Sequence, residues 1–401
     1  MPIGRTLVNE LLSNTLACLS LHDLTSASLV SKSWQATAFP HLYRTLCLTL
    51  APHLELIAER IASNADGQLS IRSHVRELIL DENYNKIVSD VGEPIAEEDL
   101  EHLAAILPKL TRLEHFSWGM SFIPRNLEVL EALQTGCPNL NSIHLAVNEG
   151  PDTLELFDDD YLSLFKFKNL LHFALEVKHL PLDYDEDHLD SLVNLLRACP
   201  DLKSLSLDLR DWDDGGYTWS PDALFRALDA TTFSSLQSFR ALGKATPDWT
   251  DFFSPPDYSP LRLFLSHHSS LSAVSIGWVD ECAYNQNIDP QTMAELLPSL
   301  KHLEAPAFFC GPVLASSLAD KIETVGVLDG RFDSTGPNLN TIAEGVASLP
   351  KLRKLALHTE DSDPIEVEPL KILVVTKSLK TRDHSGYGLA SFMSCILTAY
   401  K

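Results

Sequence analysis

The chain has 401 residues, of which 45% are hydrophobic, and a formal net charge of -24. Its length exceeds one typical compact domain, so we expect two units or a repeat array, and its apolar content argues against disorder throughout. The negative charge argues against nucleic acid as a partner, because affinity for a phosphate backbone comes largely from Lys and Arg.

The cysteines and the hydropathy pattern indicate the compartment. Seven cysteines are scattered without C-x-x-C pairs, and this odd number fits free thiols in a reducing environment better than a disulfide framework. Residues 1–12 lack the continuous apolar run of a signal peptide, and no run of about 18 apolar residues occurs elsewhere. We therefore expect a soluble intracellular protein, located in the cytoplasm, the nucleus or both.

The first fifty residues carry helical leucine patterns. A first stripe recurs with the 3.6-residue period of a helix, at Leu7, Leu11, Leu12, Leu16 and Leu19. Asp23 is a candidate N-cap for a second helix, whose apolar side carries Leu24, Ala27, Val30 and Trp34, and Pro40 ends the pattern. Such short helices bury little surface alone, so they need a partner, which periodicity leaves open as either another protein or the end of a larger domain that they cap.

Three segments resemble the F-box motif along its whole length: Leu7-Val8-Asn9-Glu10-Leu11-Leu12, Leu19-Ser20-Leu21-His22-Asp23-Leu24 and Leu29-Val30-Ser31-Lys32-Ser33-Trp34. The resemblance implies a three-helix module that docks on the Skp-type adaptor of a cullin-RING ubiquitin ligase. It implies that the adaptor-facing positions are Leu7, Leu11, Leu12, Leu16, Leu19, Leu24, Val30 and Trp34. The chain departs from the family at Val8, where proline is usual.

The segment from Pro40 to Leu46 resembles the junction of many fungal F-box proteins, in which the helices run directly into a strand. Leu46, Leu48 and Leu50 alternate as a half-buried strand should. The F-box is therefore expected at residues 1–45.

From about Pro52 onward one phrase recurs: an amphipathic helix, then L-x-x-L-x-L or a close variant, then a polar loop. The clearest strand phrases begin at Leu140, Leu202 and Leu352, and weaker copies begin at Val75, Leu110, Leu170, Leu236, Leu271, Leu300 and Ile322. The successive anchors from Leu110 to Leu271 lie farther apart than the roughly 20 to 29 residues of regular leucine-rich repeats. Residues 46–383 are therefore expected to form an irregular solenoid.

The helices between these strands are also marked. Leu100, Leu103, Ala104 and Leu107 have helical spacing, as do Leu189, Leu192, Val193 and Leu196. Ser220-Pro221 and Asp289-Pro290 are typical of an N-cap followed by the first helical residue. The predicted fold class is α/β: a short helical F-box followed by a leucine-rich-repeat-like solenoid, with a curved parallel sheet and outer helices.

A doubly wound α/β enzyme is the structural alternative. No G-x-G-x-x-G or Walker-type glycine loop follows a strand, and the strands share one pattern, unlike the varied apolar runs of a doubly wound sheet. Residues 384–401 break the repeat phrase and form a tail or a cap.

The loops after the strands are the expected place for a target, because repeat proteins commonly bind there. They hold four of the six tryptophans and acidic runs at 158–160, 183–187 and 211–214. The predicted target-binding edge consists of Asp211, Trp212, Asp213, Asp214, Tyr217, Trp219, Trp249, Phe253 and Trp278. This edge would capture a basic or aromatic segment; the alternative is that the acids are solvated surface and the tryptophans pack the loops onto the sheet.

No chemical motif stands out. His267-His268 and the scattered acids offer no H-E-x-x-H and no C-x-x-C pair, and Gly215-Gly216 is no G-x-S-x-G elbow. We therefore expect no metal, no cofactor, no membrane and no catalytic residue. The expected function is substrate recognition for a Skp/cullin/F-box-type ubiquitin ligase; the alternative is a protein-interaction scaffold, outside any ligase, whose N-terminal helices cap the solenoid.

Overall fold

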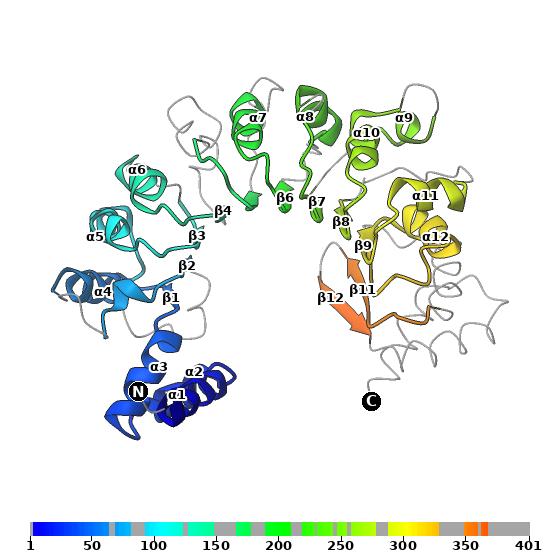
Figure 1. The fold of residues 1–401 in the computed structure, drawn as a ribbon. Coiled ribbons are helices and arrows are strands. Elements are labelled where there is room, and N and C mark those ends of the chain that lie inside the picture. Colours follow the sequence, from blue (N-terminus) through cyan, green and yellow to red (C-terminus); the bar gives the residue numbers. More distant parts are fainter. Residues whose placement is uncertain are drawn as a thin grey trace. The chain divides into compact units, whose positions relative to one another are not determined.

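The computed structural model of the chain describes residues 3–63, 69–81, 93–122, 127–147, 166–177, 189–209, 219–228, 231–243, 247–254, 258–277, 288–328, 349–359 and 362–367. The chain divides into two compact units, Met1–Ala174 (unit 1) and Leu175–Lys401 (unit 2). In both units short strands alternate with helices along the chain (Figure 1). The predicted α/β class is confirmed, with a helical region first and parallel strands that alternate with helices after it.

Unit 1 begins with three helices, α1 (Ile3–Leu16), α2 (Leu21–Ser28) and α3 (Lys32–Leu42). The N-caps of α2 and α3 are Ser20 and Ser31, whose hydroxyls accept the backbone N–H groups of Asp23 and Trp34, each at 3.2 Å. The prediction of Asp23 as N-cap was wrong: Asp23 lies in the first turn, where its carboxylate accepts the Ser20 hydroxyl at 2.7 Å.

The second predicted helix is in fact two helices. The chain leaves helical geometry between Ser28 and Lys32, so Trp34 begins a separate helix, and Pro40 lies inside α3, which ends two residues later. Val8 lies within α1. A proline there would remove a helical hydrogen bond, whereas valine lets α1 run through this position.

The repeats of unit 1 follow directly. Four strands alternate with helices: β1 (Thr45–Leu48), α4 (Ala51–Ser63), η1 (Ile71–Ser73), β2 (Glu77–Asp81), η3 (Glu97–Asp99), α5 (Leu100–Ile106), η4 (Leu107–Lys109), β3 (His115–Met120), α6 (Leu127–Gly136) and β4 (Ser142–Val147). Each strand pairs in parallel with the next along the chain. In β1, Leu46 and Leu48 are buried while Thr45 and Cys47 are exposed, as the predicted alternation requires. Leu50, the third leucine of that prediction, lies outside β1 and is partly buried.

Unit 2 continues the pattern, and β5 (His172–Val177) spans the division between the units. The further elements are α7 (Leu189–Arg197), β6 (Ser204–Leu209), α8 (Pro221–Leu228), β7 (Ser238–Gly243), α9 (Trp249–Phe253), α10 (Pro260–His267), β8 (Ala273–Ile276), α11 (Pro290–Leu296), β9 (His302–Ala305), α12 (Ala307–Ala315), β10 (Thr324–Leu328), β11 (Lys354–Thr359) and β12 (Ser362–Val367). Strands β6 to β11 pair in parallel in chain order, and β12 pairs antiparallel with β11.

The strand order decides between the two architectures. In the described part of each unit the paired strands follow chain order with no reversal, whereas a doubly wound sheet reverses at a switch point. The doubly wound alternative is therefore wrong.

The pairing register also corrects one repeat anchor. Glu77 pairs with His115, and His115 pairs with Ser142, so the residues two places earlier, Val75, Leu113 and Leu140, are structural equivalents. The anchor predicted at Leu110 is three residues too early. Leu110 and Leu113 are both buried, so burial pattern alone does not separate them.

The two faces of each strand differ. In β2 and β6 the leucines, such as Leu78 and Leu205, are buried, while alternate residues such as Glu77 and Ser204 are partly exposed. Helices lie along one side of the strands (Figure 1). Their apolar stripes, for example Leu100, Leu103 and Ile106 of α5, account for the buried face.

Candidate functional site

The helical module at the start of unit 1 has a small core of its own. Leu16, Leu24, Ala27 and Ala38 are buried together, with Leu12, Leu19 and Leu42 packed against them. Ser13 of α1 and His41 of α3 join the outer helices through a contact of 3.1 Å between Ser13 Oγ and His41 Nε2. Burial, followed by the charge of Arg44, lowers the pKa of His41, which favours its neutral form.

A second set of large apolar side chains in the module is exposed. We call this set the open leucine face: Leu11 (59% exposed), Leu21 (67%), Leu29 (82%), Val30 (65%) and Trp34 (37%). Its members come from all three helices and the turn between α2 and α3. Exposed large apolar residues gathered in one short segment are typical of a protein-binding surface.

The structure divides the eight residues predicted to face the adaptor. Leu11, Val30 and Trp34 belong to the open leucine face, and Leu12 and Leu19 are partly buried against the core. Leu16 and Leu24 are in the core, so for them the predicted docking role is corrected to a structural one. Leu7 lies in α1, and its side chain is outside the described residues.

Sequence reasoning missed Leu21 and Leu29. Leu21 is the first residue of α2, directly after the Ser20 cap, and Leu29 is the C-cap of the same helix. A helical stripe drawn through Leu24 and Val30 overlooks residues at helix ends. The Ser20-x-x-Asp23 spacing was the available signal, because it is typical of an N-cap paired with an acidic third residue.

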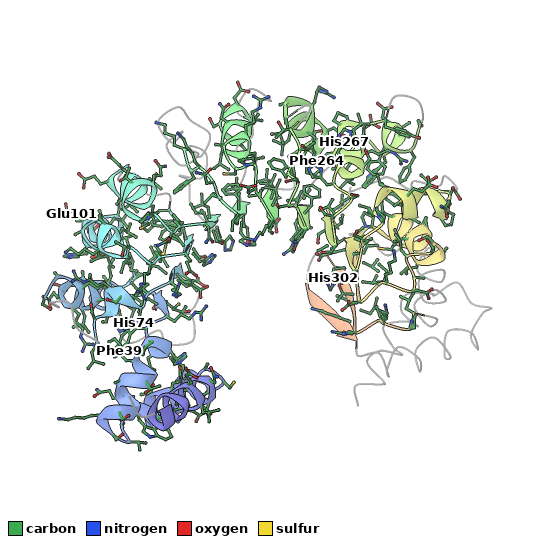
Figure 2. All side chains as sticks on the ribbon, viewed as in Figure 1. Phe39, His74, Glu101, Phe264, His267 and His302 are labelled. Carbon is green, nitrogen blue, oxygen red and sulfur yellow. The ribbon has the colours of Figure 1, made fainter. Side chains whose placement is uncertain are left out.

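Aromatic contacts join the module to the first repeat. The ring of Phe39 in α3 lies 4.4 Å from that of Tyr43 and meets the ring of His74, after η1, edge-on at 5.7 Å (Figure 2). The module is thus packed against the repeat at α3, while Leu21 of α2 and Leu29 at the C-cap of α2 remain exposed.

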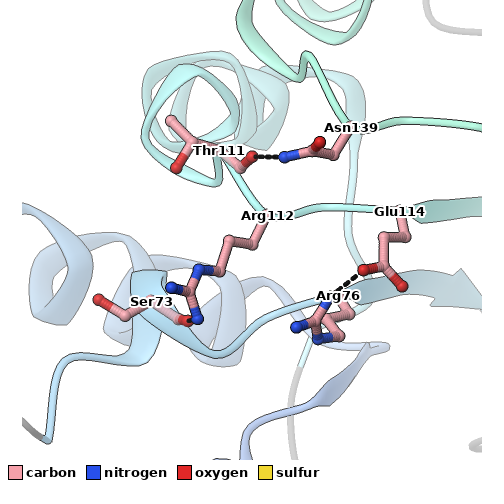
Figure 3. A network of polar contacts seen from close by, with 6 residues as sticks. All are labelled: Ser73, Arg76, Thr111, Arg112, Glu114 and Asn139. Atoms are coloured by element: carbon pink, nitrogen blue, oxygen red, sulfur yellow. Dashed lines mark hydrogen bonds and ion pairs between the residues drawn. The ribbon is translucent and has the colours of Figure 1, made fainter.

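Polar contacts then tie neighbouring repeats of unit 1 at the amino ends of the strands (Figure 3). Arg76 pairs with Glu114, Arg112 Nη1 donates to the Ser73 carbonyl at 3.2 Å, and Asn139 Nδ2 donates to the Thr111 carbonyl at 2.7 Å. These contacts hold one repeat in register with the next.

Strand residues opposite the buried face also pair across strands. Thr45 Oγ1 donates to Glu77 Oε2 at 2.8 Å, Glu77 Oε1 lies 3.8 Å from His115 Nε2, and His115 Nδ1 contacts Ser142 Oγ at 2.6 Å. Sequence reasoning did not foresee a serine beside a histidine here. We interpret the row as cross-strand packing, since each member faces its register partner.

Burial is the largest influence on the pKa of His115 and lowers it, and the charge of Glu77 opposes this effect. The neutral ring at neutral pH suits its contact with the Ser142 hydroxyl.

The predicted target-binding edge falls mostly outside the described residues: Asp211, Trp212, Asp213, Asp214, Tyr217 and Trp278, together with the acidic runs 158–160 and 183–187. Of the three that are described, Trp219 and Trp249 are buried and Phe253 is partly buried. For Trp219 and Trp249 the predicted role as exposed anchors is therefore wrong, and the alternative of packing onto the repeats holds.

Both tryptophans are fixed by neighbours within unit 2. Trp219 Nε1 donates to the Leu242 carbonyl at 2.9 Å. Trp249 opens α9, and its ring meets Phe308 edge-on at 5.1 Å and Phe309 at 5.8 Å. Such aromatic contacts stabilise the packing of α9 on α12.

Two buried polar side chains of unit 2 are also structural. The Asp222 carboxylate accepts the backbone N–H groups of Asp248 at 2.8 Å and Leu261 at 2.9 Å, and so links α8 to the starts of α9 and α10. Arg262 Nη1 donates to the Phe252 carbonyl at 3.0 Å, and its guanidinium lies 4.1 Å from the centre of the Tyr258 ring.

Groups suited to metal binding or nucleophilic chemistry are few in the described part of the chain. No cluster of three or more His, Cys, Asp or Glu able to hold a metal ion occurs there. Burial raises the pKa of the Cys137 thiol to about 12, so this cysteine is unreactive at neutral pH. Across the same described ranges, no helix combines the length and apolarity needed to span a bilayer.

Comparison with known proteins bears on the helical module. Residues 9–49 match the family model described as F-box-like. A search of the curated proteins found no match. Among solved structures, the chain is similar to one described as the "Crystal structure of Rad7 and Elc1 complex in yeast", with a TM-score of 0.39 and 14% sequence identity over 87% of this chain and 79% of that chain.

The matched residues include all of the open leucine face, both serine caps and the core of the module. The match ends directly after β1, so it includes the first strand of the repeats. The chain therefore carries an F-box-like domain at residues 9–49, followed by a domain of parallel α/β repeats.

Proposed function

We propose that this protein is a substrate-recognition adaptor of a Skp/cullin/F-box-type ubiquitin ligase. The F-box-like domain binds a Skp-type adaptor, and the repeats hold a target protein, so that target lysines come close to the ubiquitin-charged enzyme. The contribution of this chain is proximity, which raises an effective concentration, and bond chemistry is left to its partners. The protein itself is then no enzyme and needs no cofactor.

The open leucine face is the observation that carries the proposal. The core of the F-box-like domain is complete without Leu21, Leu29 and Val30, which leaves these side chains free to be covered by another protein. Each leucine that becomes fully buried on binding contributes roughly 1.5 to 3 kcal/mol from transfer out of water. Several together are enough for stable association.

The test is direct binding to a purified Skp-type adaptor, measured by calorimetry. The double variant Leu21→Glu/Leu29→Glu should weaken binding by roughly two orders of magnitude or more, since it removes two transfer contributions and buries charge. Both side chains are exposed in the free protein, so folding should be unchanged. The matched control is Leu263→Glu in α10, also an exposed leucine on a helix, which should bind normally.

The competing function is a scaffold whose N-terminal helices only cap the repeats. Wild-type protein that fails to bind the adaptor would support it, as would unchanged binding by the double variant. Deleting residues 1–40 adds a second criterion: a cap's removal should cause aggregation, whereas an F-box's removal should leave a soluble repeat domain.

A further inference from the structure

The amino ends of the last parallel strands of unit 2 carry an unusual set of charges. Parallel strands begin at the same edge of a sheet, so residues just before each strand line up. Here the alignment is fixed by backbone bonds: Glu323 N donates to the Lys301 carbonyl and Arg353 N donates to the Glu323 carbonyl, each at 2.8 Å. Lys301, Glu323 and Arg353 are therefore neighbours in front of β9, β10 and β11.

Four exposed basic residues lie in the segments just before these strands, and we call this set the basic edge: Lys301, Lys321, Lys351 and Arg353. Lys321 and Lys351 occupy equivalent positions, each three residues before its strand. In the segments that precede the three strands, residues 298–301, 319–323 and 349–353, the acids are Asp320 and Glu323, so the basic edge has an excess of positive charge. The chain as a whole has a net charge of -24.

Little of this charge is neutralised within the described residues. Arg353 Nη1 lies 3.6 Å from Glu323 Oε2, with the Arg353 side chain 79% exposed. Lys321 Nζ donates to the Pro298 carbonyl at 3.0 Å, which leaves its charge unpaired. Neither Lys301 nor Lys351 has an acidic partner in the described part of the chain.

The same edge at the earlier strands of unit 2 lacks this excess. The residues directly before β6, β7 and β8 are Lys203, Gln237 and Ser272, and those three places before are Asp201, Ser235 and Ser270. The charges of Lys203 and Asp201 cancel, so these positions carry no net charge. Within unit 2 the positive charge is therefore confined to β9, β10 and β11. In unit 1, Arg44, Arg76 and Arg112 stand at the corresponding edge of β1, β2 and β3, where Arg76 is paired with Glu114.

We propose that the basic edge is a docking surface for an acidic segment of a protein partner, rich in Asp and Glu. Neighbouring strands lie about 4.8 Å apart, so their cations form a closely spaced row that fits a chain with carboxylates in succession. A long nucleic acid would extend past this edge into the field of a strongly negative chain, whereas a short acidic segment contacts the basic edge alone. The proposal is independent of the F-box-like domain.

The test uses the full chain and a fluorescein-labelled peptide of alternating Glu and Asp, followed by fluorescence anisotropy at low and physiological salt. The triple variant Lys301→Glu/Lys321→Glu/Lys351→Glu should weaken binding by roughly tenfold or more, because like charges then face the peptide. The matched control is Lys203→Glu, which reverses an exposed lysine at the position equivalent to Lys301 and should change binding less than about twofold. Binding should weaken as salt is raised.

Several outcomes would overturn the proposal: no binding of the acidic peptide, equal loss in Lys203→Glu, or binding only of a single-stranded oligonucleotide or a phosphorylated peptide. The triple variant Lys301→Gln/Lys321→Gln/Lys351→Gln removes charge without reversing it and should weaken binding less than the variant with three glutamates does. It provides the test if the variant with three glutamates is poorly folded. Binding to a Skp-type adaptor should be unchanged in all these variants, so a failure here is distinct from a failure of the proposed ligase function.

Discussion

The F-box-like domain and the repeats of unit 2 differ in how far their apolar side chains are buried. In β6 and β7, Leu205, Leu207 and Phe239 are completely buried, and the remaining strand positions are mainly serine, charged or small residues. In the F-box-like domain, Leu21 and Leu29 are mostly exposed although a core lies beside them. The repeats complete their apolar packing within the chain, whereas the F-box-like domain keeps apolar surface for another molecule.

The largest effect on stability is expected where the repeat core is densest. Phe239 of β7 lies 5.4 Å from the rings of both Phe225 and Phe264 and is completely buried. Phe239→Ala should lower the free energy of unfolding by about 3–5 kcal/mol, through lost transfer energy and the cavity that remains. Urea unfolding followed by circular dichroism measures this change, and a loss below about 1 kcal/mol would show that the cluster is not a cohesive core.

A smaller effect is expected at the polar link between helices of unit 2. Asp222→Ala leaves the N–H groups of Asp248 and Leu261 without their acceptor, which should cost about 2–3 kcal/mol. Asp222→Asn keeps one acceptor oxygen and should fall between wild type and alanine. If asparagine and alanine were equally destabilising in urea, the charge, and not the paired hydrogen bonds, would be the important property.

A third prediction concerns acid stability. His268 is buried, its Nε2 accepts the Phe233 N–H at 2.9 Å, and its Nδ1 lies 2.6 Å from the Phe264 carbonyl, so the ring is neutral with its proton on Nδ1. Burial lowers the pKa of His268 below 6.5, opposed by the bond to Phe264. The unfolded chain then binds the proton more tightly than the folded protein, so stability is complete above pH 6.5 and falls as the pH drops below it.

The measurement is urea unfolding across pH 5 to 8. His268→Gln should reduce the slope of stability against pH, whatever its effect at neutral pH. His267→Gln removes only an exposed neighbour whose charge adds to the lowering of the His268 pKa, so it should reduce the slope less. Equal slopes in wild type and His268→Gln would show that other groups cause the acid sensitivity.

Much of the repeat architecture could be predicted from sequence because its signals are local. Asp289-Pro290 predicted the start of α11, and the Asp289 carboxylate does accept the N–H groups of Gln291 and Thr292. The phrase at Leu202 likewise predicted β6. The anchor at Leu110 failed because Leu110 and Leu113 are both buried, and only pairing with the neighbouring strands tells which one starts the repeat.

The candidate site was less predictable, since exposure depends on which neighbours the fold supplies. Leu16 and Leu29 are the same residue type in adjacent helical segments, yet one is in the core and the other is exposed. Trp249 was predicted in a polar loop as an anchor, but the chain brings Phe308 and Phe309 from a distant repeat to cover it. Contacts between residues so far apart in the sequence cannot be predicted from the spacing of nearby residues.

The smallest effect on stability is expected at an exposed leucine of the F-box-like domain. Leu29→Ala removes a side chain that is 82% exposed, so the free energy of unfolding should change by less than about 0.5 kcal/mol. Leu24→Ala, the buried counterpart in the same helix, should cost about 2–5 kcal/mol because it leaves a cavity. Adaptor binding should respond in the reverse order once folded protein is compared: weakened by Leu29→Ala and largely kept by Leu24→Ala. If both variants lost stability equally, the exposed leucine would be part of the fold, and the open leucine face would not be a docking surface.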